Sequence, residues 1–78
     1  MKPTTQIKKE ILKQIYLTGS TTAKKIPYSN ANQYLIYLEE VEGLIIRKWA
    51  NNGFKSYKEA RINPSRIDEV KSFLGVIQ

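Results

Sequence analysis

The chain has 78 residues, of which 13 are Lys or Arg and 7 are Asp or Glu, giving a formal net charge of +6. It contains no cysteine and no histidine, which excludes disulfides and sulfur-ligated zinc sites and removes the commonest general base. A chain of this length forms one small domain with little room for a deep cleft, so we expect a binding protein over residues 1–78, not an enzyme, with no metal and no cofactor.

The first predicted element is an amphipathic helix over residues 5–18. Ile7, Ile11 and Ile15 recur about one helical turn apart and form an apolar stripe. A threonine can cap the start of this helix, and Gly19 is placed to end it because glycine readily adopts a positive φ. The other faces carry three lysines that we expect to be solvated: Lys8, Lys9 and Lys13.

Targeting and membrane segments are not expected. Residues 1–5 lead into the charged helix and not into an apolar signal-peptide core. No apolar run approaches the roughly 20 residues that span a bilayer. We therefore expect a cytoplasmic protein, intracellular and nucleoid-associated, with no membrane partner.

Two further helices are predicted in the middle of the chain. A short one, of one to two turns, lies between a cap at residues 20–22 and Pro27, since proline removes a backbone donor. Another follows near 29–42, with Ser29 as its N-cap and Gly43 at its end. Its core side is a stripe made of Ala31, Tyr34, Leu35, Leu38 and Val41. Its other side carries Asn30, Asn32, Gln33, Ile36, Tyr37 and Glu40.

An acidic cluster made of Glu39, Glu40 and Glu42 lies at the carboxyl end of this helix, where the helix dipole disfavours negative charge. Two explanations are open. The cluster pairs with lysines of the first helix or of a partner, or it keeps this end of the helix away from phosphates.

A β-hairpin and a last helix complete the chain. Residues 44–46 begin a β-rich run, Asn52-Gly53 favours a hairpin turn, and the chain returns over residues 54–62. Asn63-Pro64 then offers an N-cap with proline at the first helical position. Apolar residues recur at helical spacing after it: Ile67, Val70, Phe73 or Leu74, and Ile77. The order helix, helix, helix, hairpin, helix predicts a mainly α fold with a small β-hairpin, of the α+β class.

Three segments in this order match a known pattern: Thr22-Ala23-Lys24-Lys25-Ile26, then Ala31 to Glu40, then Glu42-Gly43-Leu44-Ile45. They resemble the T-A-x-x-(I/L), Y-L-x-x-L-E and G-L-I pattern of the winged helix-turn-helix transcriptional regulator superfamily. In size and layout the chain is similar to the small fimbrial phase-variation regulators. The resemblance implies a winged helix-turn-helix fold with a recognition helix near 29–42 and a basic wing near 46–61.

The resemblance also implies that the recognition helix enters a major groove and that the wing contacts phosphates or a minor groove. Base-contact candidates are Ser29, Asn30, Asn32, Gln33 and Tyr37. Phosphate and wing candidates are Lys24, Lys25, Arg47, Lys48, Lys55, Lys58 and Arg61. Amides match the N6 and N7 edge of adenine and this side of the helix has no Arg, so we expect sites that contain A·T pairs. Alternatively, the amides cap or solvate the helix and the lysines protect edge strands.

Three aromatic residues lie in the predicted hairpin: Trp49, Phe54 and Tyr57. We expect them to pack in the core or across the strands, as aromatic residues of strands commonly do. Stacking on nucleic-acid bases is the alternative.

The net positive charge attracts polyanions, because each neutralised phosphate releases a counterion. We therefore predict a sequence-specific transcriptional regulator that binds double-stranded DNA. A homodimer through the C-terminal helix would supply the base contacts that a small domain lacks, unless that helix closes the domain's own core. Two alternatives are a winged-helix protein-interaction module and an architectural DNA-binding factor for excision or packaging.

Overall fold

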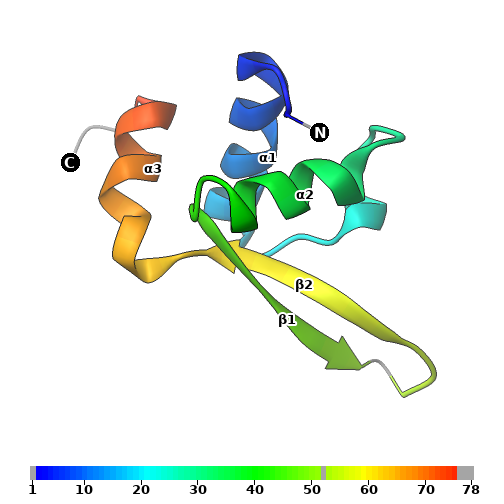
Figure 1. Ribbon diagram of the computed structural model, residues 1–78. Helices are drawn as coiled ribbons and strands as arrows, with labels where there is room; N and C mark the ends of the chain where they lie inside the picture. Colours follow the sequence, from blue (N-terminus) through cyan, green and yellow to red (C-terminus); the bar gives the residue numbers. More distant parts are fainter. Residues whose placement is uncertain (1, 52, 76–78) are drawn as a thin grey trace.

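The computed structural model describes residues 2–51 and 53–75 (Figure 1). The elements are α1 (Thr5–Thr18), the 3-10 turn η1 (Ala23–Lys25), α2 (Ala31–Glu40), β1 (Ile45–Asn51), β2 (Ser56–Ile62), the 3-10 turn η2 (Pro64–Arg66) and α3 (Ile67–Leu74). Within the described residues this is an α+β arrangement of three α-helices and one antiparallel hairpin. The predicted class and order of elements are confirmed at this level.

Helix α1 begins and ends where its end signals predict. The Thr4 hydroxyl oxygen accepts a hydrogen bond from the Ile7 N–H at 3.2 Å. Gly19 has φ 92° and its N–H donates to the Ile15 carbonyl at 2.7 Å. Ile11 and Ile15 of the apolar stripe of α1 are buried in the core, as expected, and Ile7 is partly buried against it.

The segment between α1 and α2 forms a single 3-10 turn, at the short end of the predicted one to two turns. Only η1 is helical, and Thr22 precedes it without a side-chain capping bond. Thr21 is instead extended and buried beside β2. Its N–H donates to the Ala60 carbonyl at 3.0 Å, and the Ala60 N–H donates to the Thr21 carbonyl at 2.8 Å. This bridge, which nothing in the local sequence indicated, fixes η1 beside the hairpin.

The start of α2 differs from the prediction. Ser29 is not the N-cap: the helix begins at Ala31, and Asn30 occupies the cap position without a side-chain capping bond. The loop before α2 is tied to α1 by a different contact, because the Tyr28 hydroxyl donates to the carboxylate of Glu10. Ser29 is therefore an exposed loop residue just before the start of α2.

The end of α2 also corrects the predicted stripe. Val41 is 65% exposed and does not join the core. The Glu42 N–H donates to the Tyr37 carbonyl at 3.2 Å, and the Leu44 N–H donates to the Leu38 carbonyl at 3.0 Å. These bonds span five and six residues, so the turn is wider than an α-helical one and brings Leu44 over the core in place of Val41.

The hairpin pairs β1 with β2 from Ile45↔Ile62 to Asn51↔Ser56. Gly53 has φ 97°, and its N–H donates to the Asn51 side-chain oxygen at 2.7 Å. Phe54 and Lys55 were predicted in the returning strand but lie in the loop, so the turn is longer than the predicted Asn52-Gly53 turn. Asn52 itself lies outside the described residues.

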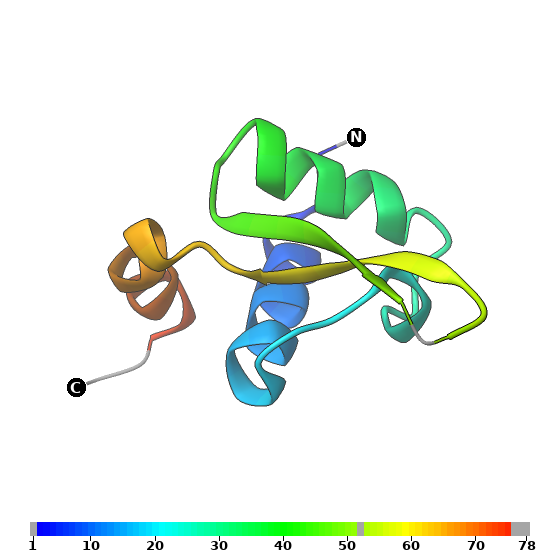
Figure 2. The same cartoon turned by 90° about the horizontal axis from the view of Figure 1, so that it is seen from below.

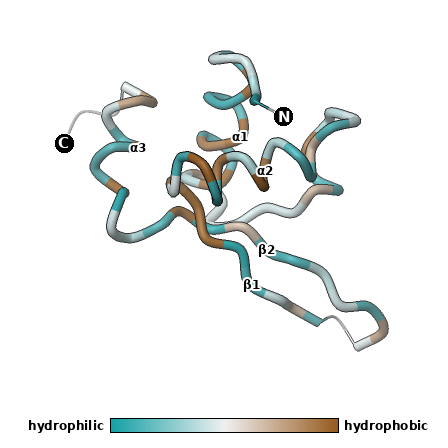
Figure 3. The backbone as a smooth tube through the Cα atoms, viewed as in Figure 1, coloured by the Kyte–Doolittle hydropathy of each residue, from teal (hydrophilic) through white to brown (hydrophobic). Residues whose placement is uncertain are grey.

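The hydrophobic core includes only the base of the hairpin, together with the inner sides of the helices. Its buried members are Ile11, Leu12, Ile15, Ile26, Ala31, Leu35, Leu38, Leu44, Ile45, Ala60 and Val70. Apolar colour follows α1, α2 and the start of β1, whereas the far end of the hairpin is mostly hydrophilic or neutral (Figure 3). Seen from below, the hairpin runs beyond the helices (Figure 2). The outer half of the hairpin therefore extends into solvent.

Helix α3 closes the domain's own core. The Asn63 side chain accepts from the Ser65 N–H at 3.0 Å and donates to the Gly43 carbonyl at 2.9 Å. Val70 is buried, and Phe73 and Leu74 pack against the core. Ile77, the last residue of the predicted stripe, lies outside the described residues.

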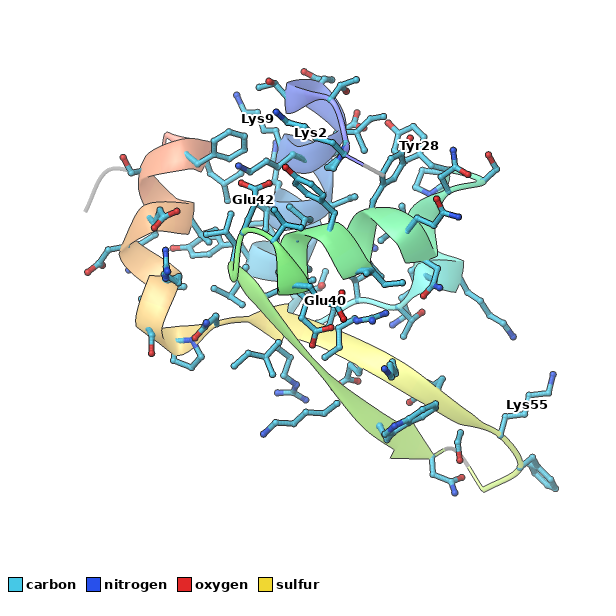
Figure 4. The ribbon with its side chains drawn as sticks, in the orientation of Figure 1. Lys2, Lys9, Tyr28, Glu40, Glu42 and Lys55 are labelled. Atoms are coloured by element: carbon cyan, nitrogen blue, oxygen red, sulfur yellow. The ribbon has the colours of Figure 1, made fainter. Side chains whose placement is uncertain are left out.

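The acidic cluster is largely explained by ion pairs. Glu42 lies 2.5 Å from the Lys8 ammonium, which also lies 4.5 Å from the centre of the Phe73 ring. Lys8 is thus half-buried, and the expectation that it is solvated was wrong. Glu39 pairs with Arg47 at 3.0 Å, while Glu40 stays exposed (Figure 4). Pairing with α1 is confirmed for Glu42.

Among the described residues, no helix combines the length and the apolar composition that crossing a membrane would require.

Candidate nucleic-acid interface

A groove of about 900 Å³ lies between η1, the first half of α2 and the hairpin. We call it the lysine groove. Its lining includes Lys24, Lys25, Asn32, Trp49, Lys55 and Lys58. Figure 4 shows Lys55 at the outer end of the hairpin. The groove thus brings together cations from η1 and from the hairpin, which are 30 to 34 residues apart in the sequence.

The hairpin cations do not share one face. Side chains alternate along a strand, so Lys58 shares the face of the buried Ala60, while Arg61 lies on the opposite face. On β1, Lys48 also lies on that opposite face, because it is the register partner of Glu59. Lys48 and Arg61 line a smaller hollow there. Arg61 also pairs with Glu59 at 2.8 Å. Of the predicted wing cations, Arg47, Lys55 and Lys58 therefore line the lysine groove, whereas Lys48 and Arg61 do not.

Arg47 is engaged inside the protein, which does not support its predicted contact with phosphate. Its side chain is only 6% exposed. The Arg47 Nε donates to one Glu39 carboxylate oxygen at 3.0 Å, and its backbone N–H donates to the other at 3.1 Å. A terminal nitrogen of Arg47 also donates to Asn32 Oδ1 at 3.3 Å. The three residues fix the angle between α2 and the hairpin.

The protonation of Glu39 follows from this contact. Burial alone would raise the pKa of Glu39, but the hydrogen bonds from the guanidinium and backbone N–H of Arg47, with the charges of Arg47 and Lys58, hold it below its ordinary value of 4.5. Glu39 therefore stays ionised in mild acid.

Replacing Glu39 by glutamine is expected to lower the free energy of unfolding by about 1–2 kcal/mol at neutral pH. The folded-state pKa of Glu39 is depressed, so its contribution is fully present above the unfolded value and is lost as pH falls through the folded value. The wild type and E39Q should differ at neutral pH and converge in acid, as measured by urea unfolding over a pH series. Glu40→Gln, which removes an exposed carboxylate one residue away, is the control and should change stability little. A difference between the wild type and E39Q that does not change with pH would contradict this account.

The predicted base-contact residues occupy different environments. Asn32 and Gln33 are exposed on the polar face of α2, and Ser29 is exposed in the loop before that helix. Asn30 and Tyr37 are half-buried. Asn32 directs its oxygen to Arg47, so its NH₂ group remains to donate. Burial makes Asn30 and Tyr37 less suited to reading bases than Asn32 and Gln33, and Ser29 lies outside the helix.

The aromatic residues of the hairpin are more exposed than predicted. Trp49 is 71% and Phe54 98% exposed, so neither packs in the core, and of the two expected arrangements only packing across the strands remains for Trp49. Trp49 makes a cross-strand contact, with the Lys58 ammonium 5.3 Å from the centre of its ring. Tyr57 is half-buried. The exposure of Trp49 and Phe54 follows from the core ending at the base of the hairpin.

Comparison with protein-family models, with curated proteins and with solved structures finds no match to the chain. Within residues 2–51 and 53–75, no group of three His, Cys, Asp or Glu side chains is placed to hold a metal ion. The site is therefore described by its own geometry: lysines and amides beside one groove.

Proposed function

We propose that the chain is a small winged helix-turn-helix protein that binds double-stranded DNA and regulates transcription. The observation that carries the proposal is the position of the polar face of α2 directly beside the lysine groove. A helix that offers amides next to a cationic groove can read base edges while the cations hold the backbone. In this proposal α2 enters the major groove and the hairpin lies along phosphates or a minor groove.

Phosphate binding is assigned to the lysines of the groove. Lys24, Lys25 and Lys58 are exposed on its two sides, and Lys55 extends it toward the hairpin loop. Each phosphate they neutralise releases a counterion, so affinity should fall steeply as salt rises. The lysines fix the position of the domain on the duplex and do not read its sequence.

Sequence reading is assigned to Gln33 and Asn32. The Gln33 side chain is exposed and makes no hydrogen bond within the described chain, so it can pair with the N6 and N7 edge of adenine. Asn32, held by Arg47, offers donors that suit acceptors such as thymine O4 or purine N7. The exposed side of α2 carries no Arg, and we expect operator sites that contain A·T pairs.

A single domain of this size makes few base contacts, so we expect it to act as a dimer or a cooperative array on repeated half-sites. The apolar side of α3 packs in the domain's own core. A homodimer through α3 would therefore use the outer residues of that helix.

Selection of bound duplexes from a random DNA pool tests the proposed function. The wild type should enrich a motif, and Asn32→Ala/Gln33→Ala should lose the motif while keeping nonspecific binding. Gln6→Ala/Ser72→Ala, which removes exposed polar groups of α1 and α3, is the matched control and should keep the motif. Failure of the wild type to enrich any DNA would overturn the regulator proposal, and an unchanged motif in the first variant would overturn the role of α2.

A further inference from the structure

Trp49 is the only tryptophan of the chain, and it lies in the middle of a regular strand with 71% of its surface exposed. It faces the lysine groove and not the opposite side of the hairpin. Such a ring is usually buried in a core or an interface, because exposing it leaves a large apolar surface in water. Its position therefore points to a ligand.

The chemistry of the groove indicates what that ligand is. Lys24, Lys25 and Lys58 surround the groove with positive charge. The carboxylate on its described lining, Glu59, is paired with Arg61 at 2.8 Å. This charge is complementary to a chain of phosphates, and the groove volume is of the size that holds small ligands, about 300–1,000 Å³.

A ligand made of phosphates alone would not explain why the Trp49 ring faces the groove. A paired base in a duplex shows only its edge in the grooves, whereas an unpaired base shows its flat face. Stacking on an aromatic ring, with lysines on the neighbouring phosphates, is how proteins bind single strands. The Lys58 ammonium, 5.3 Å from the ring centre, is on a flexible stem and can leave the ring for a phosphate when a base arrives.

We propose that the lysine groove binds a single strand of nucleic acid, with Trp49 stacked on an unpaired base and Lys24, Lys25 and Lys58 on its phosphates. This inference rests on the exposed ring and is independent of the proposed reading of duplex DNA by α2. Because both modes use the same lysines, a single strand and a duplex should compete for the protein.

The fluorescence of the single tryptophan reports on this groove directly. The full chain is titrated with four probes of equal length: oligo-dT, oligo-rU, an abasic deoxyribose-phosphate strand and a blunt duplex. We expect strong quenching by at least one of the two strands with bases, and little quenching by the abasic strand. Comparison of oligo-dT with oligo-rU shows whether DNA or RNA is preferred. Equal quenching by the abasic strand would overturn the stacking role of Trp49.

Variants of Trp49 provide the second readout, with affinity measured by the anisotropy of labelled oligonucleotides. Trp49→Leu keeps an apolar side chain but removes the ring, and it should weaken binding of the unpaired strand about tenfold or more, while Trp49→Phe should keep most of it. Circular dichroism checks that both variants fold. If W49L binds the strand as tightly as the wild type, or if only the duplex binds, the single-strand site is disproved while the proposed duplex function stands. Binding of the strand but not of the duplex would support this site and contradict the proposed function.

Discussion

Replacing Leu38 by alanine is expected to unfold a large part of the protein population. Leu38 lies on α2 at 0% exposure and is enclosed by the core between α1, α2 and the hairpin. Truncating a buried leucine costs about 2–5 kcal/mol, because the lost apolar contacts leave a cavity. A single core of this size supplies only about 3–5 kcal/mol of net stability. The unfolding midpoint in urea, followed by circular dichroism, should therefore fall sharply or the transition should disappear.

Leu17→Ala is the matched control for this prediction. Leu17 is the same residue type on α1 but is 69% exposed, so its truncation should change stability by no more than about 0.5 kcal/mol. Equal unfolding curves for the two variants would contradict the described core.

Removing Lys24, Lys25 and Lys58 together is expected to have the largest effect on DNA binding. If each lysine neutralises one phosphate, the slope of log K against log salt should become shallower by about three units. Affinity at low salt should fall on the order of a hundredfold, and the loss should be similar for all DNA sequences. Binding of a labelled duplex at several salt concentrations measures both effects.

The control removes the same charge from another surface. Lys2, Lys9 and Lys13 are exposed and lie outside the lining of the lysine groove. Lys2 and Lys9 lie near the start of α1, away from the hairpin (Figure 4). Their replacement by alanine should change the salt slope little. A loss as large as that of the groove variant would mean that net charge, and not the groove, drives binding.

The parts of the fold that could be predicted are those fixed by local chemistry. The Thr4 cap and Gly19 set the ends of α1. The wide turn after α2 contains Gly43, which has φ 67°. The start of α2 and the exposure of Val41 could not be predicted, because they depend on Tyr28 meeting α1 and on Leu44 reaching the core. Both are contacts between segments distant in sequence.

The candidate site was predicted in composition but not in arrangement. The cations can be identified from the sequence, but whether each one is available to bind a ligand depends on its partners in the folded protein. Arg47 is occupied by Glu39, eight residues away in the chain. Strand register, and not spacing, decides that Lys58 faces the groove and Lys48 does not. The exposure of Trp49 depends on where the core ends along the hairpin, which strand periodicity alone does not reveal.

The most direct test of the account is a titration of the ¹⁵N-labelled protein with a mixed-sequence DNA duplex, followed by amide chemical shifts. We predict that the shifts concentrate in residues 22–37, which include η1 and the first part of α2, and in residues 53–60 of the hairpin. Shifts confined to α1 and α3, or no shifts at low salt, would contradict the proposal that this surface binds DNA.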